Sequence, residues 1–296
     1  MGSVFKSTVA QRRTLCRTER LGHGGAGVAF EPGLGDNPPM CRFLAYRGEP
    51  IFLEELVALP QHSLLQQSLH AEHAKTVTNG DGFGIGWYGE RNEPAVYREV
   101  MPAWSDENLL ALTATVRAGL FFAHVRAATG GGIARSNCHP FRKGAHLFMH
   151  NGQIGGYALV RRSLENLLPD HLYAHRKGAT DSELLFLLAL SRLEEGLEPG
   201  DAVMWALGQA RHEMRRHGIS DPLRFAAALS DGDDLHVFRL SSDEQAPSLY
   251  LQLGDKGVTV ASEPLAGDES SWSLVPAGAL LSIGPNGVEQ RVEGLH

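Results

Sequence analysis

Short apolar runs and amphipathic stretches alternate in blocks along residues 40–296, and the blocks predict a strand–helix–strand order. Apolar and aromatic runs of five to seven residues are typical of buried strands. The first group of expected strands covers residues 41–46, 83–88, 95–100, 120–125 and 145–150. The second group covers residues 224–230, 235–240, 248–253, 258–262 and 279–283.

Helical periodicity falls between the two groups of strands and once inside the first group. Helices are expected over residues 108–118, 157–168, 181–195 and 202–217. Asp181 is placed to cap the third of these and Gly218 to end the fourth. Turn residues at 231–232, 255–257 and 286–287 indicate hairpins, as does the spacing of 83–88 and 95–100. This order predicts an α+β protein of mainly antiparallel sheets around one continuous core.

Residues 1–39 differ from the rest of the chain. They contain five Lys or Arg residues against three Asp or Glu residues, end in glycines and prolines, and show no sustained periodicity. No apolar segment typical of a secretory signal is present among them. We expect residues 1–39 to be a disordered leader, a removable propeptide or the product of a start codon assigned too far upstream. A transit peptide is the remaining alternative. We expect residues 40–296 to form a single domain in each case.

Composition narrows the class of function. The net charge of −7 does not provide the broad basic surface that nucleic acids require, so we expect no nucleic-acid partner. No apolar run approaches the length of a membrane span, and we expect no membrane association. Cys16, Cys41 and Cys138 form neither an even disulfide set nor a CxxC pattern, which favours reduced thiols and a cytoplasmic location.

Polar clusters follow or precede four of the expected strands or helices, where a rigid scaffold can hold reactive groups. The first is Cys41 after Met40. The others are HVRAATG at 124–130, NCHPF at 137–141 with HNG at 150–152, and TDSE at 180–183.

The order of these motifs resembles the class-II glutamine amidotransferases, whose catalytic cysteine directly follows the initiator methionine. The match spans nearly all of residues 40–296. NGDGFGIGWY at 79–88 and SEPL at 262–265 resemble the compact branch that includes the γ-glutamyl hydrolases of ergothioneine biosynthesis and glutathione degradation. The resemblance implies the four-layer αββα sandwich of the N-terminal-nucleophile (Ntn) hydrolases.

The resemblance also implies roles for single residues. Cys41 corresponds to the nucleophile, with its own α-amino group as base once Met40 is gone. Asn151 and Gly152 correspond to the oxyanion hole. Arg126 and Asp181 correspond to the residues that bind the α-carboxylate and α-ammonium of glutamine. Thr129 is a further candidate contact with the substrate.

Simpler interpretations of the same residues stay open at this point. Cys41 can be a buried strand residue, Arg126 a structural ion-pair partner and Asp181 only a helix N-cap. Asn151 and Gly152 also form a common hairpin-turn pair.

Two further residues have competing interpretations. Cys138, next to His139, is a rival nucleophile. Asp81, in NGDG at 79–82, differs from the corresponding motif of larger amidotransferases, and it either contacts substrate or forms a turn.

The expected reaction is hydrolysis of the γ-amide of glutamine or of a γ-glutamyl compound through a thioester, without a cofactor. Fourteen histidines, including His70 and His73, raise a metal site as an alternative, but their spacing matches no recognisable zinc motif. Residues 190–296 are needed to complete the sandwich, so any acceptor of ammonia is a separate synthase subunit. Otherwise the protein is a free-standing γ-glutamyl hydrolase, or a catalytically inactive binding or scaffold protein of the same fold.

Overall fold

The computed structural model describes residues 41–69, 79–127, 132–265 and 269–295, all within the compact unit Asn37–His296. The expected boundary between residues 39 and 40 lies outside the described residues and stays a prediction.

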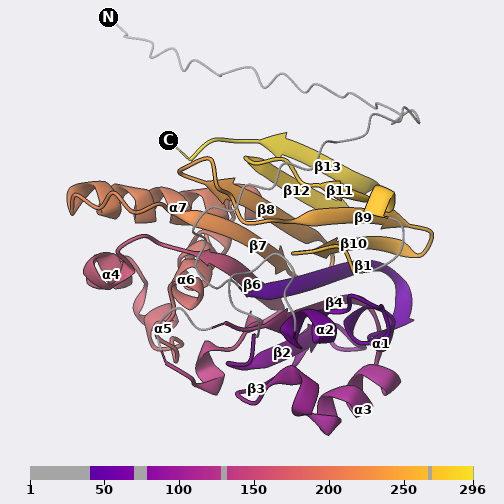
Figure 1. Cartoon of the computed structure of the whole chain (residues 1–296). Coiled ribbons are helices and arrows are strands. Elements are labelled where there is room, and N and C mark those ends of the chain that lie inside the picture. The colour runs from indigo at the N-terminus through magenta and orange to yellow at the C-terminus, as the bar shows by residue number, and fades with distance from the viewer. Residues whose placement is uncertain (1–40, 70–78, 128–131, 266–268, 296) are drawn as a thin grey trace, which may run out of the picture. The chain divides into compact units, whose positions relative to one another are not determined.

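Two antiparallel sheets form the centre of this unit (Figure 1). In the described residues the first sheet has seven strands in the order β11-β9-β10-β1-β4-β2-β3. Its strands are β1 (Arg42–Phe52), β2 (Phe83–Trp87), β3 (Ala95–Glu99), β4 (Arg117–Val125), β9 (Tyr250–Gly254), β10 (Gly257–Ala261) and β11 (Trp272–Leu274). The second has six strands in the order β13-β12-β8-β7-β6-β5. Its strands are β5 (Phe141–Lys143), β6 (His146–Gln153), β7 (Arg224–Ser230), β8 (Leu235–Ser241), β12 (Ala279–Gly284) and β13 (Gly287–Val292).

Helices cover the outer face of each sheet. Beside the first sheet lie α1 (Glu54–Val57), α2 (Leu64–Leu69) and α3 (Glu107–Thr115), and beside the second lie α4 (Tyr157–Glu165), α5 (Asp170–Tyr173), α6 (Asp181–Leu193) and α7 (Pro199–Arg216). Short 3-10 turns occur at Ala103–Ser105, Arg135–Asn137 and Glu269–Ser271. The result is the four-layer αββα sandwich that the resemblance implied.

Successive side chains of β1 point alternately into two different cores, and this shows how the sequence builds the layers. Phe43 and Ala45 belong to the core between the two sheets, whereas Leu44 and Tyr46 belong to the core between the first sheet and its helices. Successive strand residues point to opposite faces, so a strand buried on both faces must be apolar throughout. Helix α6 is buried around most of its circumference for a similar reason, since it packs on β6 and on the neighbouring helices.

All ten expected strands are confirmed, with ends displaced by up to six residues. The expected hairpins at 231–232, 255–257 and 286–287 connect paired strands, as does the segment between β2 and β3. The helix expected over 108–118 ends earlier, at Thr115, because Arg117 and Ala118 pair with β1 and begin β4. Helices α1, α2 and α5 were not predicted, since four to six residues are too few to show helical periodicity.

Replacement of Phe186 by Ala tests the core between α6 and the second sheet. The Phe186 ring is 1% exposed and stacks on Phe148 with a centroid distance of 5.3 Å. Loss of a buried ring leaves a cavity and should lower the free energy of unfolding by about 3–5 kcal/mol in denaturant titrations. Leu159→Ala on α4, where the side chain is 64% exposed, is the control and should change it by less than about 1 kcal/mol. Equal effects of the two substitutions would contradict this packing.

Candidate active site

Cys41 lies directly before β1, at the end of the first sheet where β4 also ends. Its Sγ atom is 3.4 Å from the backbone nitrogen of Ala127 and 3.5 Å from the carbonyl oxygen of Ala127. Burial raises the pKa of the Cys41 thiol above its ordinary value, while the Ala127 backbone and the Arg126 and Arg42 guanidinium groups act in the opposite direction. A thiol in this state needs a base to become a nucleophile.

Two donors hold the carbonyl oxygen of Cys41. The side-chain amide of Asn151 donates to it across 2.7 Å, and Nη1 of Arg42 donates to it across 3.2 Å. An amide Nδ2 has two hydrogens, so Asn151 keeps one for a second acceptor.

Arg42 is itself held in the interior by an acidic residue. It is 1% exposed and forms an ion pair with Glu263, which is fully buried and also lies 2.9 Å from the ring of His62. Glu263 belongs to the SEPL segment at 262–265, and the sequence alone did not indicate its role. A buried charge pair of this kind depends on both partners, because either one alone would be an uncompensated charge.

Asn151 and Gly152 lie inside β6, where they pair with Ala226 and Phe225 of β7. The interpretation of this pair as a hairpin turn is therefore wrong. Gly152 has a φ of 144°, and a Cβ atom there would lie 2.0 Å from the carbonyl oxygen of Arg224. Only glycine fits this position.

Arg126 follows the last residue of β4 and is 3% exposed. Its backbone nitrogen donates to Gly82 and its carbonyl accepts from Asp81, while Nη1 lies 3.4 Å from the carbonyl oxygen of Asp81. The main chain of the 79–82 segment thus positions Arg126. Asp81 is not among the residues that line the cavity described below.

Asp181 is the first residue of α6, and the N-cap is Thr180, whose hydroxyl accepts from the nitrogen of Glu183. The expectation that Asp181 caps this helix is therefore corrected. Instead, its Oδ2 accepts from the backbone nitrogen of Ile154 and its Oδ1 from that of Ser182, each across 2.8 Å. These bonds fix the carboxylate beside the end of β6.

Cys41, Arg126, Gly152 and Asp181 line one cavity of about 210 Å³. Asn151 joins them through its bond to the Cys41 carbonyl. The structure thus brings five of the six residues expected in the site to one place. The sixth, Thr129, lies outside the described residues.

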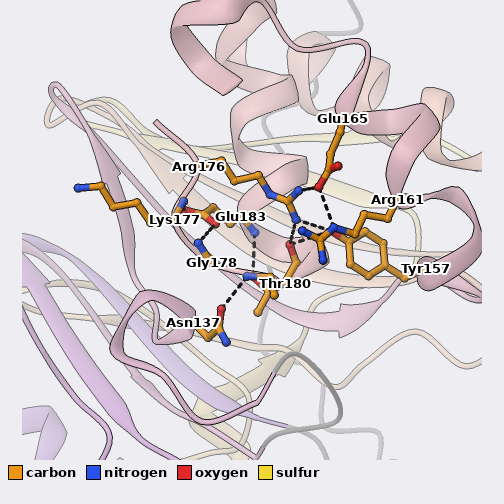
Figure 2. Close-up of polar contacts among 10 residues, drawn as sticks. Asn137, Tyr157, Arg161, Glu165, Arg176, Lys177, Gly178, Thr180 and Glu183 are labelled. Carbon is orange, nitrogen blue, oxygen red and sulfur yellow. Dashed lines mark hydrogen bonds and ion pairs between the residues drawn. The ribbon is translucent and has the colours of Figure 1, made fainter. Parts of the chain in front are cut away.

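Several residues of the cavity were not predicted from the sequence. Tyr157 and Ser182 line it, and His150 joins Ser182 through a 2.9 Å contact between Nδ1 and Oγ. Figure 2 shows that the hydroxyl of Tyr157 accepts from Arg176, which also pairs with Glu165 on α4.

The rival nucleophile Cys138 is fully buried and does not line this cavity. Its Sγ lies 3.5 Å from the carbonyl oxygen of Glu99, and burial raises its pKa. Cys138 follows the 3-10 turn at Arg135–Asn137 and precedes β5.

The neighbouring histidines are buried. His139 lines the cavity and stacks on His124 with a centroid distance of 4.2 Å, and burial lowers the pKa of His124 to about 3. Among the described residues, no three His, Cys, Asp or Glu side chains are grouped as metal ligands. His70 and His73 lie outside those residues.

Comparison with known protein families shows to which family this chain belongs. The model of the class-II glutamine amidotransferases matches residues 59–282. The chain belongs to this family. It is 32% identical to the probable glutamine amidotransferase DUG3 of Saccharomyces cerevisiae, over 82% of each chain. It is 29% identical to the γ-glutamyl-hercynylcysteine sulfoxide hydrolase of Mycolicibacterium smegmatis, over 82% of this chain and 96% of the relative.

Solved structures agree with this assignment. A glutamine aminotransferase class-II domain protein from Silicibacter pomeroyi superposes with a TM-score of 0.68 at 37% identity, covering 86% of this chain and all of the other. The glutamine phosphoribosylpyrophosphate amidotransferase of B. subtilis, at 17% identity and a TM-score of 0.59, shares the fold. The described helices of the amidotransferase chain include none long and apolar enough to cross a membrane.

Glu263→Gln tests the buried ion pair of Arg42 and Glu263, the clamp beside Cys41. The substitution leaves the charge of Arg42 without its buried partner, so the free energy of unfolding should fall by about 3–5 kcal/mol. Glu55→Gln is the control, because Glu55 pairs with Lys256 at the surface and should contribute no more than about 1 kcal/mol. Denaturant unfolding measures both, and a loss at Glu263 no larger than at Glu55 would show that the clamp does not stabilise the fold.

Proposed function

We propose that this amidotransferase hydrolyses the γ-amide of glutamine or of a γ-glutamyl compound, with Cys41 as its N-terminal nucleophile. The observation that carries the proposal is the cavity in which Cys41 faces one buried guanidinium and one fixed carboxylate, Arg126 and Asp181. A small-molecule substrate with a free amino-acid head group has both charges that these side chains complement.

In the proposed mechanism the thiol of Cys41 is the nucleophile and its α-amine transfers the proton. Sγ attacks the γ-carbonyl carbon, and the thiol proton passes to the α-amino group. The second hydrogen of the Asn151 amide and the backbone N–H of Gly152 stabilise the oxyanion. The C–N bond then breaks as the amine returns the proton to the leaving nitrogen, which departs as ammonia or an amine. Water then attacks the γ-glutamyl thioester and gives a proton to the α-amine. The C–S bond breaks, glutamate leaves, and the amine returns the proton to the Cys41 thiolate.

This mechanism requires Cys41 to be the first residue. A free α-amine with a pKa of about 7.7–8.0 can accept the thiol proton, whereas an amide nitrogen cannot. We therefore propose that residues 1–39 are absent from the mature enzyme, through cleavage as a propeptide or through translation from Met40, and that Met40 is removed. The raised pKa of the Cys41 thiol makes such a base necessary.

Two versions of this function differ in the group that leaves the γ-carbonyl carbon and in what receives it. A free-standing γ-glutamyl hydrolase is favoured by the M. smegmatis relative, a hydrolase of a γ-glutamyl sulfoxide that aligns over 96% of its own length. The alternative is a glutaminase that passes ammonia to a separate synthase subunit. Release of glutamate from glutamine and from a panel of γ-glutamyl amides, with and without candidate subunits, separates them. Hydrolysis of none of these amides would sink both versions.

A third possibility from a different class is an inactive binding or scaffold protein that keeps this fold. It predicts that the N-terminus stays blocked by residues 1–39 in cells. The intact mass of the native protein decides the question, because a mature start at Cys41 disfavours the scaffold and a persistent leader supports it.

Two cysteine variants of protein expressed from Met40 test the nucleophile. Cys41→Ala should abolish glutamate release from glutamine, since no other thiol lines the cavity in the described residues. Cys138→Ala removes the rival thiol from a buried site and should retain activity within about tenfold of the parent. The reverse pattern would assign the chemistry to Cys138.

Asp181→Asn tests recognition of the substrate ammonium. The amide keeps the shape of the side chain but loses the charge, and a charge-assisted hydrogen bond contributes about 1.5–3 kcal/mol. KM for glutamine should therefore rise by about 10- to 100-fold, with a smaller change in kcat. Asp233→Asn, at an exposed turn, is the control and should leave both parameters unchanged. An unchanged KM in Asp181→Asn would exclude this role.

A further inference from the structure

A second and larger cavity, of about 400 Å³, is lined in part by the segment that leads into α6. Its lining comes from β3, β5, α6 and residues 135, 136, 175 and 177. It shares no lining residue with the cavity of Cys41. Figure 2 shows Lys177 extending away from the Arg176–Tyr157 network beside the Cys41 cavity.

The lining of this second cavity is strongly basic. Its cationic side chains are Arg98, Arg135, Arg142 and Lys177, and His175 lies with them. Such a cluster is unexpected on a chain with a net charge of −7. Positive charge concentrated in a concave surface attracts anions.

Few acidic groups offset these charges. Arg135 pairs with Glu99, and the one lining carboxylate, that of Glu183, accepts from the backbone nitrogens of Lys177 and Gly178 across 3.0 and 2.6 Å.

The other three cations are Arg98, Arg142 and Lys177, and the described residues include no carboxylate paired with them. Arg98 donates to the carbonyl of Cys138 and Arg142 to that of Pro94. In the described part of the chain, neither they nor Lys177 form an ion pair with a carboxylate.

Arg98 shows the energetic consequence of this arrangement. Its side chain is half-buried on β3, and burial lowers its pKa. Cys138 and Glu183 act in the opposite direction, whereas the charges of Arg142 and Arg135 lower the pKa further. A cation in such a place is stabilised by an anion that enters the cavity.

Ser136 and four apolar residues complete the lining. Phe141, Phe186 and Leu187 are each 3% exposed or less, so their surfaces are already covered within the protein, and Val96 is half-buried. The surface that this cavity offers to a ligand is therefore mainly that of its cationic side chains, and its volume of about 400 Å³ is sufficient for a small molecule.

We propose that this cavity is a binding site for a small anion that bears a phosphate or carboxylate group. The anionic group lies among Arg98, Arg142 and Lys177. The site is separate from the glutaminase cavity and does not rest on the proposed reaction.

Calorimetric titration of the full chain with phenyl phosphate, benzoate and inorganic phosphate tests the site at low ionic strength. At least one of the three anions should bind saturably with one site per chain, and higher ionic strength should weaken its binding because the site is formed by cations. The comparison of phenyl phosphate with benzoate shows which anionic group the cations prefer.

A matched pair of double variants locates the binding. Arg142→Gln with Lys177→Gln changes two exposed side chains of the cavity and should weaken binding by about tenfold or more. Arg91→Gln with Arg162→Gln removes the same net charge from exposed positions elsewhere and should leave affinity unchanged. Cys41→Ala should also bind as the parent does, whatever its glutaminase activity.

Three results would overturn the proposal. They are the absence of saturable binding for all three probes, equal weakening by the two double variants, and loss of binding in Cys41→Ala, which would move the anion to the other cavity.

Discussion

The hydrogen bond from the Asn151 amide to the Cys41 carbonyl joins the start of β1 in one sheet to β6 in the other. It fixes the residue that carries the thiol relative to the strand that contains the proposed oxyanion donors. Behind it, the buried pair of Arg42 and Glu263 holds the same carbonyl from a second side. Positioning of reacting groups to within a fraction of an ångström is a large part of catalysis, and here it comes from contacts between distant strands.

The two charges that we propose to bind the substrate are also positioned by contacts between separate elements, here with the main chain. Arg126 is held by the backbone of residues 81–82, and Asp181 by the backbone nitrogens of Ile154 and Ser182. Each charged group is thus oriented by rigid elements before any substrate arrives, so little ordering free energy has to be spent on binding.

Local patterns predicted the strands and the longer helices, whereas the resemblance to the class-II glutamine amidotransferases implied the four-layer sandwich and the site residues. The apolar runs after Cys41 and in β4, and the HNG and TDSE motifs that carry the resemblance, are all readable in short windows. The Glu263 clamp was not predicted, because it joins residues separated by 221 positions and a Glu in a loop has many other uses. The N-cap was assigned to Asp181 instead of Thr180 for a related reason, since adjacent residues can both cap and only the backbone geometry decides. The basic cavity was also missed, because its cations come from separate elements.

The account depends most directly on Cys41 reacting as a free N-terminal residue. Protein expressed from Met40 can be treated with a glutamine-like diazoketone, which alkylates the nucleophile of a glutaminase site, and then mapped by peptide mass spectrometry. The account predicts one adduct, on the thiol of a Cys41 whose α-amine is free, and protection by excess glutamine. An adduct on Cys138, or on a Cys41 that is still preceded by Met40, would contradict it.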